Sequence, residues 1–191
     1  MPIQSAGLCW LRPLFITIVA AAAAILAGAQ SRQSATPPVS SKDVEIVFLG
    51  TGYPAPNADR QGPALAVVAH GKAYLVDVGS GVARQANSAF QRGIPGLQPR
   101  ELDIAFLTHL HSDHTLGLPD LIFTPWIYER TKPLRLYGPS GTKAMASHIL
   151  EAYQEDIEVR TTGLEGGNTT GYKSRFTKSN RAVSIRMKIS Q

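Results

Sequence analysis

The sequence predicts a mixed α/β domain, and three observations carry this prediction. Residues 64–76 contain two apolar runs separated by His70-Gly71-Lys72, which is a β-hairpin signal. Later in the chain, short apolar runs alternate with longer helical stretches, a pattern typical of strand–helix units. The length of 191 residues and the 43% hydrophobic content fit one globular domain.

The N-terminal residues resemble a targeting segment rather than part of the domain. A single charge, Arg12, precedes an apolar run over residues 14–29, and this run ends in small residues that a signal peptidase accepts. We expect a signal peptide over residues 1–29 and a secreted or periplasmic protein without stable membrane insertion. An uncleaved anchor is the alternative, although a spanning helix needs about 20 apolar residues. Residues 30–43 are rich in Ser, Thr, Pro and Gln and are expected to form a flexible linker.

The first part of the domain is expected to form three strands and a helix. Residues 44–50 are a β-branched run that ends in glycine, which indicates a strand entering a tight loop. Pro and Gly punctuate residues 53–63, which predicts a loop. The hairpin follows, and its second apolar run stops at Asp77 before a Gly-Ser-Gly turn. Residues 82–93 are expected to form a short helix that ends at Gly93.

The later part is expected to continue as strand, helix, strand and helix. The strands are predicted at residues 103–109 and 134–139, and the helices at residues 112–130 and 140–157. The apolar side chains on one face of the last helix are expected to be core contacts: Met145, Ile149, Ala152, Tyr153 and Ile157.

The end of the chain has a different charge balance. Residues 166–191 carry six Lys or Arg and no Asp or Glu, so the net charge of +5 belongs to this segment. Residues 172–191 show no strand–turn pattern and are expected to form an atypical basic tail. One hypothesis is a reading frame lost shortly after Gly171. The alternative is a natural tail for anionic partners.

Three of the five histidines and an aspartate lie within six positions, as His109, His111, Asp113 and His114. At the end of a strand, residues two apart point to the same side, which pairs His109 with His111. Asp113 and His114 follow where the strand gives way to a helix, and can serve a second metal. The only cysteine, Cys9, precedes the predicted cleavage site, so a metal site must use histidines and carboxylates. Such ligands suit zinc, with manganese and iron as alternatives.

The surrounding motifs resemble those of the metallo-β-lactamase fold. The resemblance rests on the H-x-H-x-D-H order and narrows to the ribonuclease Z branch, with its secreted arylsulfatase-like relatives. The segments that carry it are FLGTG at 48–52, VDVGSG at 76–81, THLHSDHTLGLPDL at 108–121 and LRLYGPSGT at 134–142. It implies an αββα sandwich, of which residues 44–171 would form the first half only.

The resemblance also implies roles for individual residues. His109 and His111 would bind a first zinc ion, and Asp113 and His114 a second. Asp113 would also orient or deprotonate the attacking water. Asp77 would hold a ligand histidine through its other ring nitrogen, although a plain turn carboxylate explains it as well.

The sequence departs from the family pattern after His114. The family uses a further histidine, an aspartate that bridges both metals and a final histidine. After His114 this chain has only His148, in the middle of a predicted helix, and it has no acid after Glu165. Two interpretations therefore stay open. One is a zinc-dependent hydrolase of phosphoesters or sulfate esters, and the other is a catalytically incompetent fragment that lacks the second-half ligands.

The expected partners follow from the predicted export. A signal peptide favours a small ester substrate over tRNA, so nucleic acid is the less favoured partner. Without a second half, one sheet face would lack its packing partner. A homodimer is one expected consequence, since uncovered apolar area favours association.

Overall fold

The computed structural model describes residues 44–55 and 57–179. The predicted signal peptide, the predicted linker and the chain beyond residue 179 lie outside the described residues. Within the described ranges, no helix is both long and apolar enough to cross a membrane.

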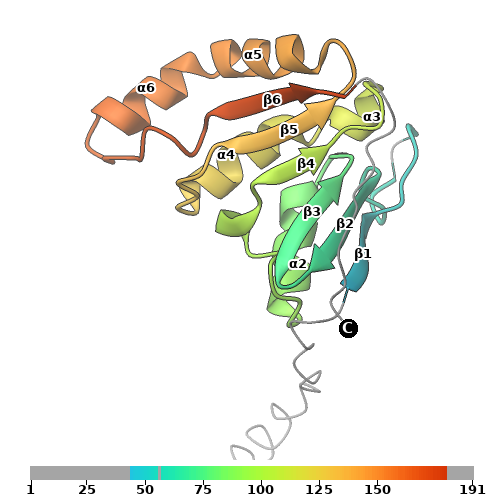
Figure 1. Cartoon of the computed structure of the whole chain (residues 1–191). Helices are drawn as coiled ribbons and strands as arrows, with labels where there is room; N and C mark the ends of the chain where they lie inside the picture. Colours follow the sequence, from blue (N-terminus) through green and yellow to red (C-terminus); the bar gives the residue numbers. More distant parts are fainter. Residues whose placement is uncertain (1–43, 56, 180–191) are drawn as a thin grey trace, which may run out of the picture. The chain divides into compact units, whose positions relative to one another are not determined.

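The described residues form a six-stranded sheet in which the strands follow their chain order (Figure 1). The strands β1, β2 and β3 pair antiparallel, and β3, β4, β5 and β6 pair parallel. This is the predicted change from an early hairpin to later strand–helix units. The bounds are β1 Val44–Gly50, β2 Ala64–Ala69, β3 Lys72–Val76, β4 Ile104–Phe106, β5 Leu134–Gly138 and β6 Ser174–Lys178.

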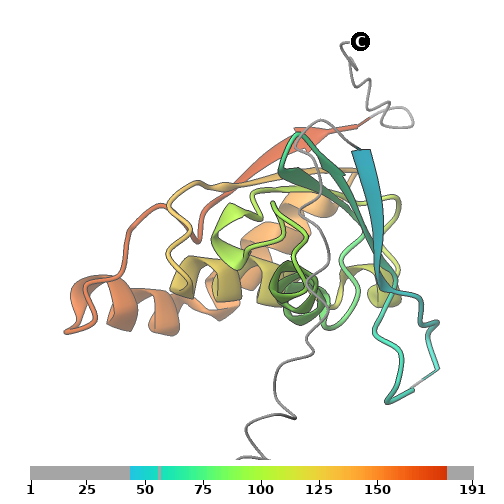
Figure 2. The same cartoon turned by 90° about the horizontal axis from the view of Figure 1, so that it is seen from below.

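The helices lie together on one side of this sheet (Figure 2). Their bounds are α2 Val82–Gln91, α3 Ser112–Thr115, α4 Leu118–Ile127, α5 Thr142–Ala152 and α6 Gln154–Thr162, with a 3-10 helix, η1, at Pro99–Glu101. The side chains between sheet and helices form one hydrophobic core, to which every strand from β1 to β5 contributes. The mixed α/β class that the sequence predicts is therefore confirmed.

The opposite face of the sheet carries exposed apolar side chains on β1. Because successive residues of a strand point to opposite faces, Val47 and Leu49 pack toward the core, whereas Ile46 and Phe48 point away from it. Ile46 is 60% exposed and Phe48 is 73% exposed. Exposed apolar residues of this kind favour association, and the expected homodimer stays a prediction.

Three expectations about local structure are wrong. The strand that precedes the histidine cluster ends at Phe106, so His109 and His111 lie in a loop instead of on a strand. The predicted helix over residues 140–157 is broken at Tyr153, where the backbone leaves the helical conformation. The Tyr153 ring lies against Phe123, with the ring centroids 4.5 Å apart and the planes tilted by 34°.

The break changes the predicted apolar face of that helix. Met145, Ile149 and Ile157 pack against the core as expected, but Ala152 and Tyr153 are exposed.

The third wrong expectation concerns the segment after Gly171, because Ser174–Lys178 forms β6. This strand pairs with β5 at the edge of the sheet, where largely polar residues are tolerated.

A buried arginine ties the end of α4 to two other segments. Arg130 is 1% exposed, and its guanidinium donates hydrogen bonds to the carbonyl oxygens of Leu102, Leu121, Ile122 and Gly171 at 2.7–3.2 Å. Pro125 lies inside α4 and has no N–H to donate to Leu121, so Arg130 supplies the missing donor.

The Arg130 side chain keeps its charge despite its burial. Desolvation lowers the pKa of Arg130 to about 10, while the nearby negative charge of Asp103 acts in the opposite direction. The guanidinium is therefore protonated at neutral pH, and four carbonyl dipoles compensate its charge. An apolar replacement would leave these carbonyl groups buried without partners, which is costly.

We expect Arg130→Met to lower the free energy of unfolding by about 3–5 kcal/mol, as for a broken buried charge network. Arg92→Met is the matched control, because Arg92 is exposed and its guanidinium bonds only to Ser88 among the described residues. The control should change stability by less than about 0.5 kcal/mol. Urea unfolding of both variants measures the difference, and equal midpoints would contradict the role given to Arg130.

Candidate metal centre

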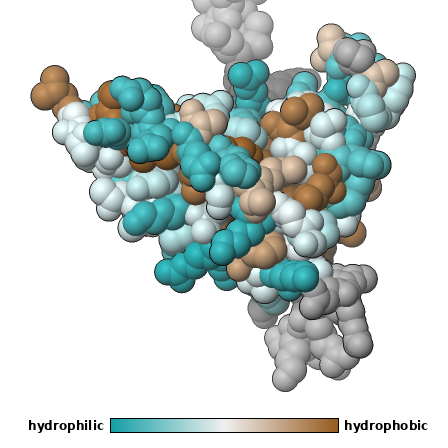
Figure 3. Space-filling model, turned by 90° about the horizontal axis from the view of Figure 1, so that it is seen from above, coloured by the Kyte–Doolittle hydropathy of each residue, from teal (hydrophilic) through white to brown (hydrophobic). Residues whose placement is uncertain are grey.

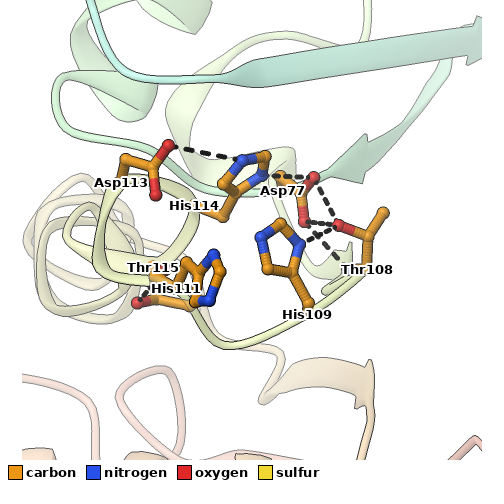
Figure 4. Close-up of polar contacts among 7 residues, drawn as sticks. All are labelled: Asp77, Thr108, His109, His111, Asp113, His114 and Thr115. Atoms are coloured by element: carbon orange, nitrogen blue, oxygen red, sulfur yellow. Dashed lines mark hydrogen bonds and ion pairs between the residues drawn. The ribbon is translucent and has the colours of Figure 1, made fainter. Parts of the chain in front are cut away.

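The candidate centre lies at the carboxyl ends of two neighbouring parallel strands. Asp77 directly follows β3, and the histidine cluster follows β4 on a loop and on the short helix α3. Because β3 and β4 are parallel partners, both segments leave the sheet at the same edge, where open α/β sheets place their ligand sites. Figure 4 shows that the side chains of the four predicted ligands and of Asp77 lie close together.

The backbone holds Asp77 in an unusual conformation. Its φ angle is 57°, in the left-handed region that few residues other than Gly, Asn and Asp adopt. Its N–H donates to the carbonyl oxygen of Phe106 at 2.8 Å, and its carboxylate accepts the N–H of Thr108 at 2.8 Å. These two bonds connect the end of β3 to the chain leaving β4.

Close backbone contacts hold the segment that carries the histidine cluster against residues 77–79. Val78 donates its N–H to the carbonyl oxygen of His114 at 2.9 Å, and Gly117 donates to the carbonyl oxygen of Val78 at 2.8 Å. A β-carbon at Gly79 would collide with the backbone of Gly62 and with the carbonyl oxygen of Asp113. The glycine in the Gly-Ser-Gly turn is therefore required for this approach.

The predicted ligands come close together. The ring centroids of His109 and His111 are 4.6 Å apart, and those of His109 and His114 are 4.1 Å apart. An oxygen of Asp113 lies 3.5 Å from Nε2 of His114. The side chains of His114 and Asp113 are 22% and 16% exposed, so solvent and a small ligand can reach them.

Asp77 makes the contact that the family resemblance implies for it. Its buried carboxylate lies 2.8 Å from Nδ1 of His114. A carboxylate only accepts hydrogen bonds, so Nδ1 of His114 is a nitrogen that carries a proton. The other ring nitrogen, Nε2, lies on the side of Asp113 (Figure 4). This arrangement is the one that metal-binding histidines usually have, while metal binding itself stays a prediction.

The donor set fits a metal ion in kind but is incomplete in number. Imidazole nitrogens and carboxylate oxygens suit zinc. Within residues 44–55 and 57–179, however, no three His, Cys, Asp or Glu side chains are arranged to hold one ion. The other histidines do not join the cluster, since His70 lies in the hairpin turn and His148 pairs with Glu151 on the exposed surface of α5.

Sequence reasoning gave no role to Thr108, which the structure places in the centre. Its hydroxyl lies 2.8 Å from the carboxylate of Asp77 and 2.9 Å from Nδ1 of His109. The only signal in the sequence was its position next to His109. The left-handed Asp77 that brings the two segments together has no sequence signature.

A cavity of about 550 Å³ opens beside Asp113. Its lining includes the cationic Arg60, the hydroxyl of Ser80, and two apolar side chains, Tyr53 and Leu116, that are each 65% exposed. The face seen from above in Figure 3 likewise mixes hydrophobic and hydrophilic patches. The cavity can therefore offer both apolar contact and a positive charge to a small molecule.

Comparisons with known proteins agree with this architecture. Residues 58–168 match the metallo-beta-lactamase superfamily. A ribonuclease Z of Mycobacterium sp. (strain KMS) is 41% identical over 119 residues, which are 61% of this chain and 40% of that protein. A ribonuclease Z of Pyrococcus abyssi is 38% identical over 109 residues, which are 57% of this chain and 34% of that protein.

A solved structure supports the fold alone. The long form of ribonuclease Z from yeast superimposes with a TM-score of 0.54 at 18% identity, covering 79% of this chain and 20% of the yeast chain. The chain spans less than half the length of the ribonuclease Z relatives that it matches. Its matched residues include Asp77 and the whole histidine cluster. The chain belongs to the metallo-beta-lactamase superfamily and is related to ribonuclease Z, with a match that covers roughly the first half of that fold.

Proposed function

We propose that the chain is a zinc-dependent hydrolase of small phosphoesters or sulfate esters. The observation that carries this proposal is the gathering of three imidazoles and Asp113 at one sheet edge, with Asp77 holding His114 through Nδ1. Members of the superfamily typically bind zinc ions. His109 and His111 would hold one ion, and Asp113 and His114 a second.

Zinc in such a site would activate water and polarise the bond to be cleaved. Asp113 would orient that water or accept its proton, and its side chain is only 16% exposed and lies against His114. Asp77 would keep the His114 ring in place through its bond to Nδ1. Manganese and iron are alternatives to zinc, because the same nitrogen and oxygen donors bind them.

The proposed substrate is a small anionic ester. The cavity beside Asp113 has room for one, and Arg60 on its wall can neutralise a phosphate or sulfate group. A secreted or periplasmic location would fit such a substrate better than tRNA. The name ribonuclease Z belongs to the relatives, and this chain spans only part of their length.

A second candidate is a catalytically incompetent chain, and one observation favours it. Catalytic zinc sites usually have three protein ligands and a water, whereas the described residues offer two pairs and no group of three. Such a chain would bind zinc weakly, and metal binding would contribute little to its stability. Zinc affinity and hydrolysis therefore separate the two candidates.

Zinc affinity tests the proposed ligands. We expect His114→Ala to weaken zinc binding by more than about 100-fold, because losing a direct ligand should cost at least as much as losing a residue that orients one. His148→Ala is the control, since His148 is exposed and contacts only Glu151 among the described residues. Competition with a chromogenic chelator measures both, and equal affinities would remove His114 from the site.

Hydrolysis tests the role of Asp113. With zinc present, the full chain should cleave bis(p-nitrophenyl) phosphate or p-nitrophenyl sulfate faster than free zinc does. Asp113→Asn should lower kcat by about 10²–10⁴-fold, the usual contribution of a general base, while His148→Ala should not. A wild-type rate equal to that of free zinc would support the incompetent chain instead.

A further inference from the structure

We infer that Thr108 is a positioning residue that fixes the ring of His109 with a proton on Nδ1. The hydroxyl of Thr108 bridges Asp77 and His109 (Figure 4). The consequence of this arrangement for zinc binding rests on the proposed function. The position of the proton on the His109 ring, in contrast, is a property of the metal-free chain.

The direction of the hydrogen bonds follows from what each group can donate. The Thr108 hydroxyl has one proton and lies 3.0 and 2.8 Å from the two carboxylate oxygens of Asp77. A carboxylate has no proton to give, so the hydroxyl donates to Asp77. The oxygen of Thr108 is then left only as an acceptor toward Nδ1 of His109, which lies 2.9 Å away. That nitrogen must therefore carry the proton.

One buried carboxylate in this way orients two histidines. Asp77 accepts the Nδ1 proton of His114 directly, and it orders His109 through Thr108. Both rings are thus held through Nδ1, and their centroids are 4.1 Å apart. Within the described residues the ring of His111 has no hydrogen-bond partner, so the Asp77 carboxylate orients His109 and His114 alone.

The burial of Asp77 and the exposure of Thr108 determine how much the Thr108 hydroxyl should contribute to zinc binding. Asp77 is 7% exposed and its position is held by backbone bonds, so the acceptor for Thr108 is fixed. Thr108 is itself exposed, and water can partly replace its hydroxyl. We therefore expect its loss to weaken zinc binding by about 10-fold, the lower end of the range for residues that orient metal ligands.

The test compares three single substitutions in the full chain. Thr108→Val removes the hydroxyl but keeps the shape and the backbone N–H bond to Asp77. Thr108→Ser restores a hydroxyl. Thr115→Val is the matched control, because the hydroxyl of Thr115 lies on the same motif but bonds to the carbonyl oxygen of His111 and not to a ring nitrogen.

The primary readout is the proton position on His109, measured by long-range ¹H–¹⁵N NMR on the metal-free chain. Wild type, Thr108→Ser and Thr115→Val should have the proton on Nδ1. Thr108→Val should shift it toward Nε2. An unchanged proton position in Thr108→Val would overturn the inference.

Zinc affinity is the second readout and separates the inference from the proposed function. Binding by wild type that weakens about 10-fold in Thr108→Val but not in Thr108→Ser or Thr115→Val supports both. Equal affinity in all four chains overturns the role of Thr108 in zinc binding and leaves the proposed function standing. No zinc binding by wild type overturns the proposed function, and the NMR result still decides whether Thr108 sets the proton on His109.

Discussion

The carboxylate of Asp77 joins the end of β3 to the histidine cluster that follows β4, and the geometry of the candidate centre depends on this contact. Its two oxygens accept hydrogen bonds from the backbone N–H and hydroxyl of Thr108 and from Nδ1 of His114. The residue is buried and has a left-handed backbone conformation that is rare for a residue with a side chain. Uncommon backbone conformations often occur at functional sites, where the surrounding structure maintains them.

Much of the fold could be predicted because hydrophobic spacing and glycine positions depend on local chemistry. The hairpin about His70-Gly71, the helix that ends before Gly93 and the change to parallel strands all follow from such patterns. The short β4, the break at Tyr153 and the strand β6 could not be predicted, because distant contacts decide them. The strand β4 ends shortly before Thr108, whose backbone N–H donates to the Asp77 carboxylate. The polar strand β6 is held by its hydrogen bonds to β5.

In the candidate site, too, some features follow from local sequence motifs and others from distant contacts. The order of histidines and aspartate predicted which side chains come close together, and their binding of metal stays a prediction. The contact between Asp77 and His114 agrees with the role that the resemblance implies for Asp77. Thr108 and Arg130 gave no such signal, since their partners are carboxylate and carbonyl oxygens brought near by the fold. The candidate ligands and Asp77 thus lie in recognisable local motifs, whereas Thr108 and Arg130 gain their partners only in the tertiary structure.

Hydrogen bonds hold the rings of His109 and His114, yet the described residues supply fewer donors than a catalytic zinc site usually has. We propose that the chain nevertheless holds two metal ions in two pairs of ligands. Elemental analysis of the purified full chain after zinc loading and dialysis tests this most directly. Two zinc ions per chain is the result that the proposal predicts. One ion or none would contradict it and would favour the second candidate, a chain that lacks a complete two-metal site.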